Sequence, residues 1–122
     1  MYTDFTQMPV WKNAMDIATE VYHISETLPR KEDYALTSQI RRSAESISAN
    51  IAEGFGRGGE REKSQFYRIA RGSANETKSH LLYGCRVHYF EAQKTEGIII
   101  MLETVIFELN KIIRTLENKR GS

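Results

Sequence analysis

Apolar residues recur in steps of four and three along separate stretches of the chain, and this rhythm constrains the fold more than any other feature. It is most regular over about residues 95–118, where the apolar positions are Ile98, Leu102, Val105, Leu109, Ile112 and Leu116. Such spacing gathers apolar side chains into one stripe of an α-helix that packs almost parallel to its neighbours. No stretch alternates apolar and polar residues, so the sequence indicates no β-strand.

Three earlier stretches, at about residues 10–28, 34–53 and 60–89, show the same rhythm. Short connections make consecutive helices antiparallel, so we predict an all-α fold, an up-down-up-down four-helix bundle spanning residues 1–122 as one domain. The third helix would be the longest, at about 45 Å. Asp33 and Thr95 are the expected N-caps of the second and fourth helices.

Small residues and glycines indicate where helices approach one another closely. The second stretch is rich in serine and alanine, which allow a neighbouring helix to come near. Gly72 and Gly84 lie inside the third stretch, where each costs roughly 1 kcal/mol relative to alanine. We therefore expect close backbone contacts at both glycines.

The charge is unevenly distributed, although the formal net charge of the chain is only +1. Residues 54–90 contain seven basic and three acidic side chains, whereas residues 1–40 contain three basic and six acidic ones. The sequence shows no signal peptide and no apolar run long enough to span a bilayer, and Cys85 is the only cysteine. These features predict a cytoplasmic protein without a disulfide or a membrane partner.

A glycine-rich motif, G-x-G-x-x-G, is formed by Gly54, Gly56 and Gly59. A dinucleotide-binding loop needs a strand before its glycines, but here a helical pattern precedes them, and the Gly-Lys-Ser/Thr of a phosphate-binding loop is absent. We therefore interpret this segment as a hinge between two helices, in which Gly54 or Gly56 ends the second helix in a left-handed conformation. An enzyme that uses the loop for a nucleotide is the competing, less favoured hypothesis.

A basic stripe follows the hinge, with arginines and a lysine spaced by seven, three and seven residues on one side of the third helix. The hinge and the second helix add three arginines, and guanidinium groups are well suited to binding phosphates. The predicted nucleic-acid-binding residues are Arg41, Arg42, Arg57, Arg61, Arg68, Arg71 and Lys78. The alternative is a solvated face in which Glu45 and Glu53 neutralise nearby arginines.

No pattern indicates catalysis, a metal or a cofactor. His80 and His88 lie about 12 Å apart along a helix, too far to share one metal ion. Cys85 has no base placed beside it by the sequence, so it is expected to pack in the bundle. The aromatic residues Tyr22, Tyr67, Tyr83, Tyr89 and Phe90 are consistent either with core packing or with a subunit interface.

Three segments, WKNAMDIATEVY, LTSQIRRSAESISANIAEGFGR and SQFYRIARGSANET, resemble the family of bacterial 23S rRNA intervening-sequence proteins. The resemblance covers nearly the whole chain and implies a four-helix bundle that assembles as a homopentamer. A related branch is the accessory protein of diversity-generating retroelements, which binds nucleic acid and a reverse transcriptase through a basic surface. The low net charge of this chain departs from that branch. The resemblance thus implies a non-catalytic scaffold that binds RNA or DNA, or alternatively an adaptor for a reverse transcriptase.

Overall fold

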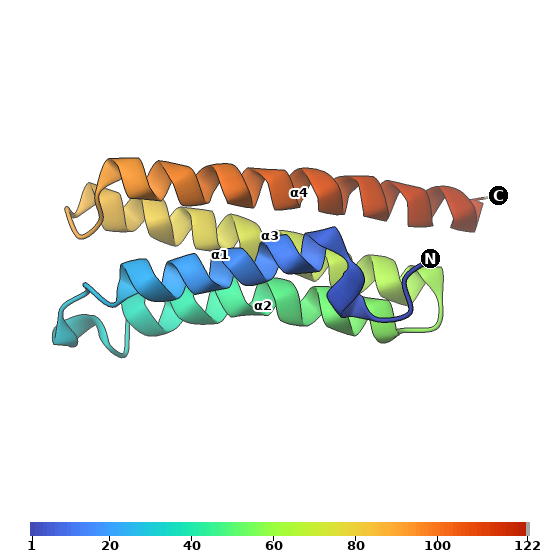
Figure 1. The fold of residues 1–122 in the computed structure, drawn as a ribbon, viewed down its shortest axis with the longest axis horizontal. Coiled ribbons are helices and arrows are strands. Elements are labelled where there is room, and N and C mark those ends of the chain that lie inside the picture. The colour runs from blue at the N-terminus through green and yellow to red at the C-terminus, as the bar shows by residue number, and fades with distance from the viewer. Residues whose placement is uncertain (122) are drawn as a thin grey trace.

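The chain folds into antiparallel α-helices in up-down-up-down order (Figure 1). The computed structural model describes the backbone of residues 1–121 and the side chains of residues 1–119. The elements, in chain order, are η1 (Phe5–Gln7), α1 (Pro9–Ser25), η2 (Arg30–Glu32), α2 (Leu36–Gly56), α3 (Glu60–Arg86) and α4 (Ala92–Gly121), where η marks a 3-10 helix. The predicted all-α four-helix bundle is confirmed. The longest helix is α4, with 30 residues, and not α3, with 27.

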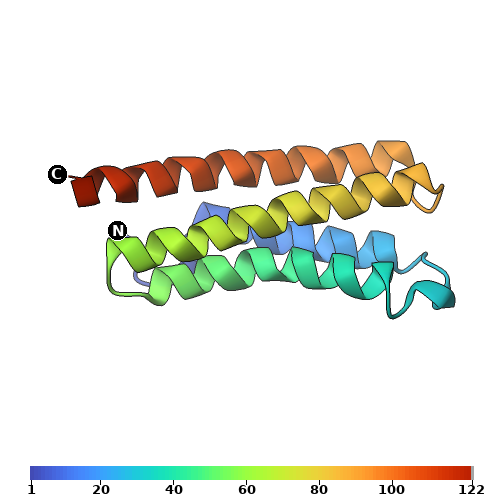
Figure 2. The same cartoon turned by 180° about the vertical axis from the view of Figure 1, so that it is seen from behind.

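The helices form a square in which α3 lies between α2 and α4, as the view from behind shows (Figure 2). The fourth side of the square is the boundary between α1 and α4. Both termini and the connection between α2 and α3 lie at one end of the bundle, which we call the hairpin end (Figure 1). The connections between α1 and α2 and between α3 and α4 lie at the opposite end.

Small residues bring α2 and α3 together, as the sequence predicts. The hydroxyl oxygens of Ser43 and Thr77 are 2.8 Å apart, and those of Ser46 and Ser73 are 3.0 Å apart. Ala74, between these two pairs, and Ala70, one turn before Ala74, are fully buried. The two helices are therefore held by short hydrogen bonds as well as by apolar contact.

The core follows the predicted stripes, with two shifts. In α3 the four-three rhythm places Ile69 in the apolar stripe, but the core takes Tyr67, which is 3% exposed, while Ile69 is 45% exposed. In α4 Ile113 is buried and Ile112 only half-buried. An α-helix has 3.6 residues per turn and not 3.5, so the buried stripe drifts around each helix and a strict four-three reading misplaces residues near its ends.

Neither predicted N-cap is correct. α2 begins at Leu36, after Ala35, and the Leu36 N–H donates to Glu32 Oε1 at 3.3 Å. α4 begins at Ala92, so Thr95 lies inside the helix, where it is buried. The Glu32 carboxylate therefore accepts a hydrogen bond from the first N–H of α2, a role that we expected of Asp33.

No glycine among the described residues has a positive φ, so none is needed for a left-handed backbone conformation. At Gly54 and Gly84 the missing side chain instead leaves room for a neighbouring aromatic ring. The prediction that Gly54 or Gly56 ends α2 in a left-handed conformation is wrong. A Cβ at Gly54 would lie 2.9 Å from the Tyr67 ring, and one at Gly84 would lie 2.3 Å from the Phe90 ring. Gly72 has nothing within 4 Å, so no close contact explains it. The described residue with a left-handed backbone is His88, at φ 67°, just after α3.

None of the described helices contains an apolar stretch long enough to cross a membrane.

Candidate functional site

The basic stripe of α3 lies along its seam with α4, where three of its side chains meet partners from α4. Lys78 Nζ lies 3.2 Å from Glu103 Oε2, and Arg71 Nη1 donates to Asn110 Oδ1 at 2.9 Å. The positions advance by seven residues in opposite directions along the two helices, as an antiparallel pair requires. Arg68 forms an ion pair with Glu117. Much of the predicted stripe is therefore part of the polar border between two helices.

Arg57 is fixed in the hinge between α2 and α3. Its guanidinium lies 2.9 Å from Glu53 and 3.6 Å from Glu62, and it stacks over the Phe66 ring with its carbon 4.8 Å from the ring centre. Two carboxylates thus compensate this arginine. The alternative in which Glu53 neutralises Arg57 is confirmed.

The glycine-rich motif forms the hinge that the sequence predicts, because helices stand on both sides of it. Lys63 reaches back across the hinge, and its Nζ donates to the carbonyl oxygens of Phe55 at 2.7 Å and Gly54 at 3.3 Å. Both are carbonyls of the last turn of α2, where the regular helical donors run out, and the Gly54 oxygen also accepts from the Arg57 N–H at 3.2 Å. The lysine that follows the glycines therefore stabilises a helix end.

Arg41 and Arg42 do not join the stripe of α3. Arg41 turns toward α1, where its Nε donates to Ser25 Oγ at 2.7 Å and its guanidinium covers the Tyr22 ring at 4.3 Å. Arg42 is exposed, with no partner among the described residues. The expectation that both would extend one shared patch is wrong, because the stripe borders α4, and α2 makes no contact with α4 in the described part of the chain.

One group of arginines does gather, at the hairpin end of the α3–α4 seam. We call it the arginine cluster, and it consists of Arg61, Arg68, Arg71 and Arg114. Arg114 is four residues after Asn110 and three before Glu117, the partners of Arg71 and Arg68, so it lies on the same side of α4. Arg61 is seven residues before Arg68 and continues the same line of α3.

The arginine cluster carries an excess of positive charge. Glu117 is the one carboxylate, among the side chains that the structure describes, that pairs with any of its members. Arg61 and Arg114 are exposed and have no partner within residues 1–119. Sequence reasoning missed Arg114, because only the register of α4 against α3 places it beside the partners of Arg71 and Arg68.

The aromatic residues divide between core and surface. Tyr67 and Phe90 are buried, and burial raises the pKa of the Tyr67 hydroxyl. Tyr22 and Tyr83 are about half exposed. The Tyr89 hydroxyl donates to Glu32 Oε2 at 2.9 Å, which links the two connections at the end opposite the hairpin and raises the pKa of Tyr89.

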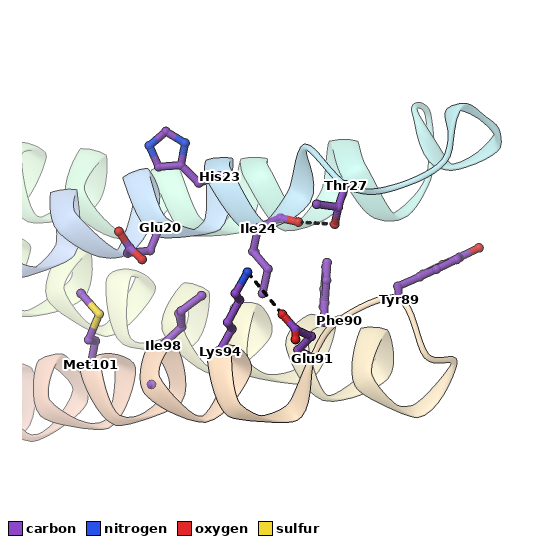
Figure 3. Close-up of a pocket in the computed structure, with 11 residues that line it drawn as sticks. Glu20, His23, Ile24, Thr27, Tyr89, Phe90, Glu91, Lys94, Ile98 and Met101 are labelled. Carbon is purple, nitrogen blue, oxygen red and sulfur yellow. Dashed lines mark hydrogen bonds and ion pairs between the residues drawn. The ribbon is translucent and has the colours of Figure 1, made fainter.

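A groove of about 620 Å³ lies between α1 and α4 near that opposite end (Figure 3). Ile24, Phe90, Ile98 and Met101 give it an apolar lining, and Glu20, His23 and the Lys94–Glu91 ion pair stand around it (Figure 3). It contains none of the predicted binding residues. Within the described residues, no group of histidine, cysteine or acidic side chains is arranged to hold a metal ion. Cys85 is half-buried against the core.

Comparison with known proteins gives one family and one informative structure. The family model of the 23S rRNA-intervening sequence protein matches residues 6–111. A crystal structure of a protein with unknown function, from the S23 ribosomal protein family of Bacteroides thetaiotaomicron VPI-5482, superposes with a TM-score of 0.79. The alignment has 26% sequence identity and covers 85% of this chain and 97% of that one. No curated protein sequence is significantly similar to the chain.

Proposed function

The chain belongs to the 23S rRNA-intervening sequence protein family, and from this premise we propose that it is a non-catalytic protein that binds the phosphates of RNA or DNA through the arginine cluster. The observation that supports this proposal is the pair of exposed arginines, Arg61 and Arg114, in a cluster whose described members have a single pairing carboxylate, Glu117. Guanidinium groups donate two parallel hydrogen bonds to a phosphate, and they stay charged at all physiological pH values.

The rest of the predicted set has a smaller part in this proposal. Arg57 and Lys78 are already paired with carboxylates, and Arg41 is turned toward α1. Displacing such partners lowers the gain from a new phosphate contact. With a net charge of only +1 on the whole chain, binding is expected to be moderate, independent of sequence and strongly weakened by salt.

The test compares two double variants with the same change in charge. We expect Arg61→Glu with Arg114→Glu to weaken binding to a labelled hairpin RNA about tenfold or more at low salt. The magnitude of the negative slope of log affinity against log salt should fall by about 0.7–0.9 for each phosphate-contacting arginine that is lost. Fluorescence anisotropy measures both quantities, and circular dichroism checks that the helices persist.

The matched control is Arg42→Glu with Arg86→Glu, since both arginines are exposed and unpaired among the described residues but lie outside the cluster. It should retain most of the affinity. Equal losses in the two double variants would refute the assignment to the arginine cluster. Unchanged binding in both would refute phosphate binding by any of these four arginines.

Self-association is the second part of the proposal, with the homopentamer that the family resemblance implies as the expected state. Ile69 and Tyr83, which are 45% and 54% exposed, lie on one line of α3, since 14 residues separate them. Gly72 lies on the same outward side and is exposed, with open space around it. This line is a suitable contact surface, and light scattering of the purified protein measures the number of copies directly.

The second candidate function is an adaptor that docks an acidic protein surface, such as that of a reverse transcriptase. It is favoured by the ion pairs of Arg68 with Glu117 and Lys78 with Glu103, which show that this seam accepts carboxylates. Binding of a purified reverse transcriptase that survives nuclease treatment would support the adaptor. Loss of that binding on nuclease treatment would instead support the nucleic acid as the bridge.

A further inference from the structure

Phe107 is an exposed phenylalanine on the outer surface of α4, with 64% of its surface accessible. The other four phenylalanines of the chain are all buried or half-buried. A phenylalanine ring that stays in water gives up the free energy that its burial would contribute, so its exposure asks for an explanation.

One cation contacts this ring, and arginines lie further along the same side of α4 and on α3. Lys111 places its Nζ 5.6 Å from the centre of the ring. Arg114 lies seven residues further along α4, about 10 Å away on the same line of the helix. Arg71 reaches Asn110, which is three residues from Phe107 and one turn away. The carboxylate one turn before the ring, Glu103, is engaged by Lys78. The ring therefore lies at the edge of the arginine cluster.

On the basis of the proposed function above, we propose that Phe107 stacks on a nucleobase, so that the preferred ligand of the arginine cluster is a single strand and not a duplex. Proteins that bind single strands combine a cationic surface for the backbone with exposed aromatic rings for the bases. A duplex holds its bases stacked on one another and presents mainly phosphates to the same surface. The phosphates of a single strand would contact Arg114 and Arg61 while a base lies on Phe107.

A second copy of the chain is a less suitable occupant of this face. A twofold contact through Phe107 would bring Lys111 and Arg114 close to the same cations of the partner, and like charges at an interface are strongly unfavourable. A ring contact joins two different surfaces, and the line of Ile69 and Tyr83 on α3 already serves that contact in the proposed function. A polyanion meets the same surface with complementary charge.

The experiment measures binding of a labelled oligouridylate and of a blunt-ended duplex RNA of equal charge to the intact protein. Phe107→Ala should weaken binding of the oligouridylate about 5- to 100-fold and leave binding of the duplex unchanged. Phe107→Trp should restore or strengthen it, because indole retains the stacking face. Tyr34→Ala is the control, since Tyr34 is 98% exposed but lies before α2, at the end opposite the hairpin.

The outcomes separate this inference from the proposed function. If Phe107→Ala binds the oligouridylate as well as the wild type does, while the Arg61 and Arg114 double variant has lost binding, stacking is refuted and phosphate binding stands. If light scattering shows fewer copies for Phe107→Ala, the ring is a subunit contact and the inference is overturned. If the wild type binds neither RNA, both the inference and the proposed function fail.

Discussion

Gly72 and Gly84 lie on the same helix, twelve residues apart, in opposite surroundings. A methyl group on Gly84 would collide with the buried Phe90 ring, whereas one on Gly72 would meet nothing. Gly84→Ala should therefore destabilise the protein by about 1–3 kcal/mol, the usual cost of overpacking. Gly72→Ala should stabilise it by up to about 1 kcal/mol, because alanine is the better helix former.

Urea unfolding followed by circular dichroism measures both values. The two variants differ only in position, so each serves as the control for the other. A stabilised Gly84→Ala would mean that Phe90 moves aside freely, and the packing of the connection between α3 and α4 would then be looser than the structure indicates.

At the scale of the helices, the hinge between α2 and α3 depends on Lys63. Its ammonium group donates to two carbonyl oxygens at the end of α2, and its Nζ lies 5.5 Å from the centre of the Phe55 ring. Lys63→Met keeps a long apolar side chain but removes these hydrogen bonds. We expect a loss of about 1–3 kcal/mol in the free energy of unfolding, as for hydrogen bonds made by a charged group.

Lys12→Met on α1 is the matched control, because Lys12 is exposed and has no partner among the described residues. It should change stability by no more than about 0.5 kcal/mol. Equal effects of the two substitutions, measured by urea unfolding, would show that Lys63 adds nothing as a helix cap.

The helices themselves could be predicted from the sequence, because burial of one stripe per helix imposes a period that is visible without coordinates. The partners of the arginines could not. Arg71 meets Asn110, and Arg68 meets Glu117, only because α3 and α4 have a particular register, and residues 39 or more apart give no local signal of it. The same holds for Arg41, whose contact with Ser25 depends on how α1 lies against α2. The helix caps were missed for a different reason. Glu32 accepts from the start of α2 and Lys63 donates to its end, but neither residue stands at the cap position next to the helix.

At the scale of the whole molecule, Glu117 limits the positive charge at the hairpin end. Glu117→Gln removes the one described carboxylate that pairs with the arginine cluster, and it leaves Arg68 free to bind a phosphate. An exposed charge pair is worth up to about 1 kcal/mol, so affinity for RNA should rise about two- to fivefold. Anisotropy titrations at two salt concentrations measure this rise in affinity. The rise should be smaller at the higher salt concentration, because salt screens exposed charges.

Glu26→Gln provides the control, since it makes the same change in net charge at the opposite end of the bundle, where Glu26 lies 3.5 Å from His23. It should leave affinity nearly unchanged. An equal gain from both substitutions would indicate that only the total charge matters, and not the position of the cluster.

The up-down-up-down order of the four α-helices has a practical consequence, because it returns the end of α4 to the end of the bundle where the chain begins (Figure 1). A short linker could join the end of α4 to the beginning of the chain, and the chain could be reopened between α1 and α2 to give a circular permutant. In that protein α1 would follow α4 directly, so the two helices that border the groove would become covalent neighbours. Any fusion partner would then be attached at the far end, away from the arginines.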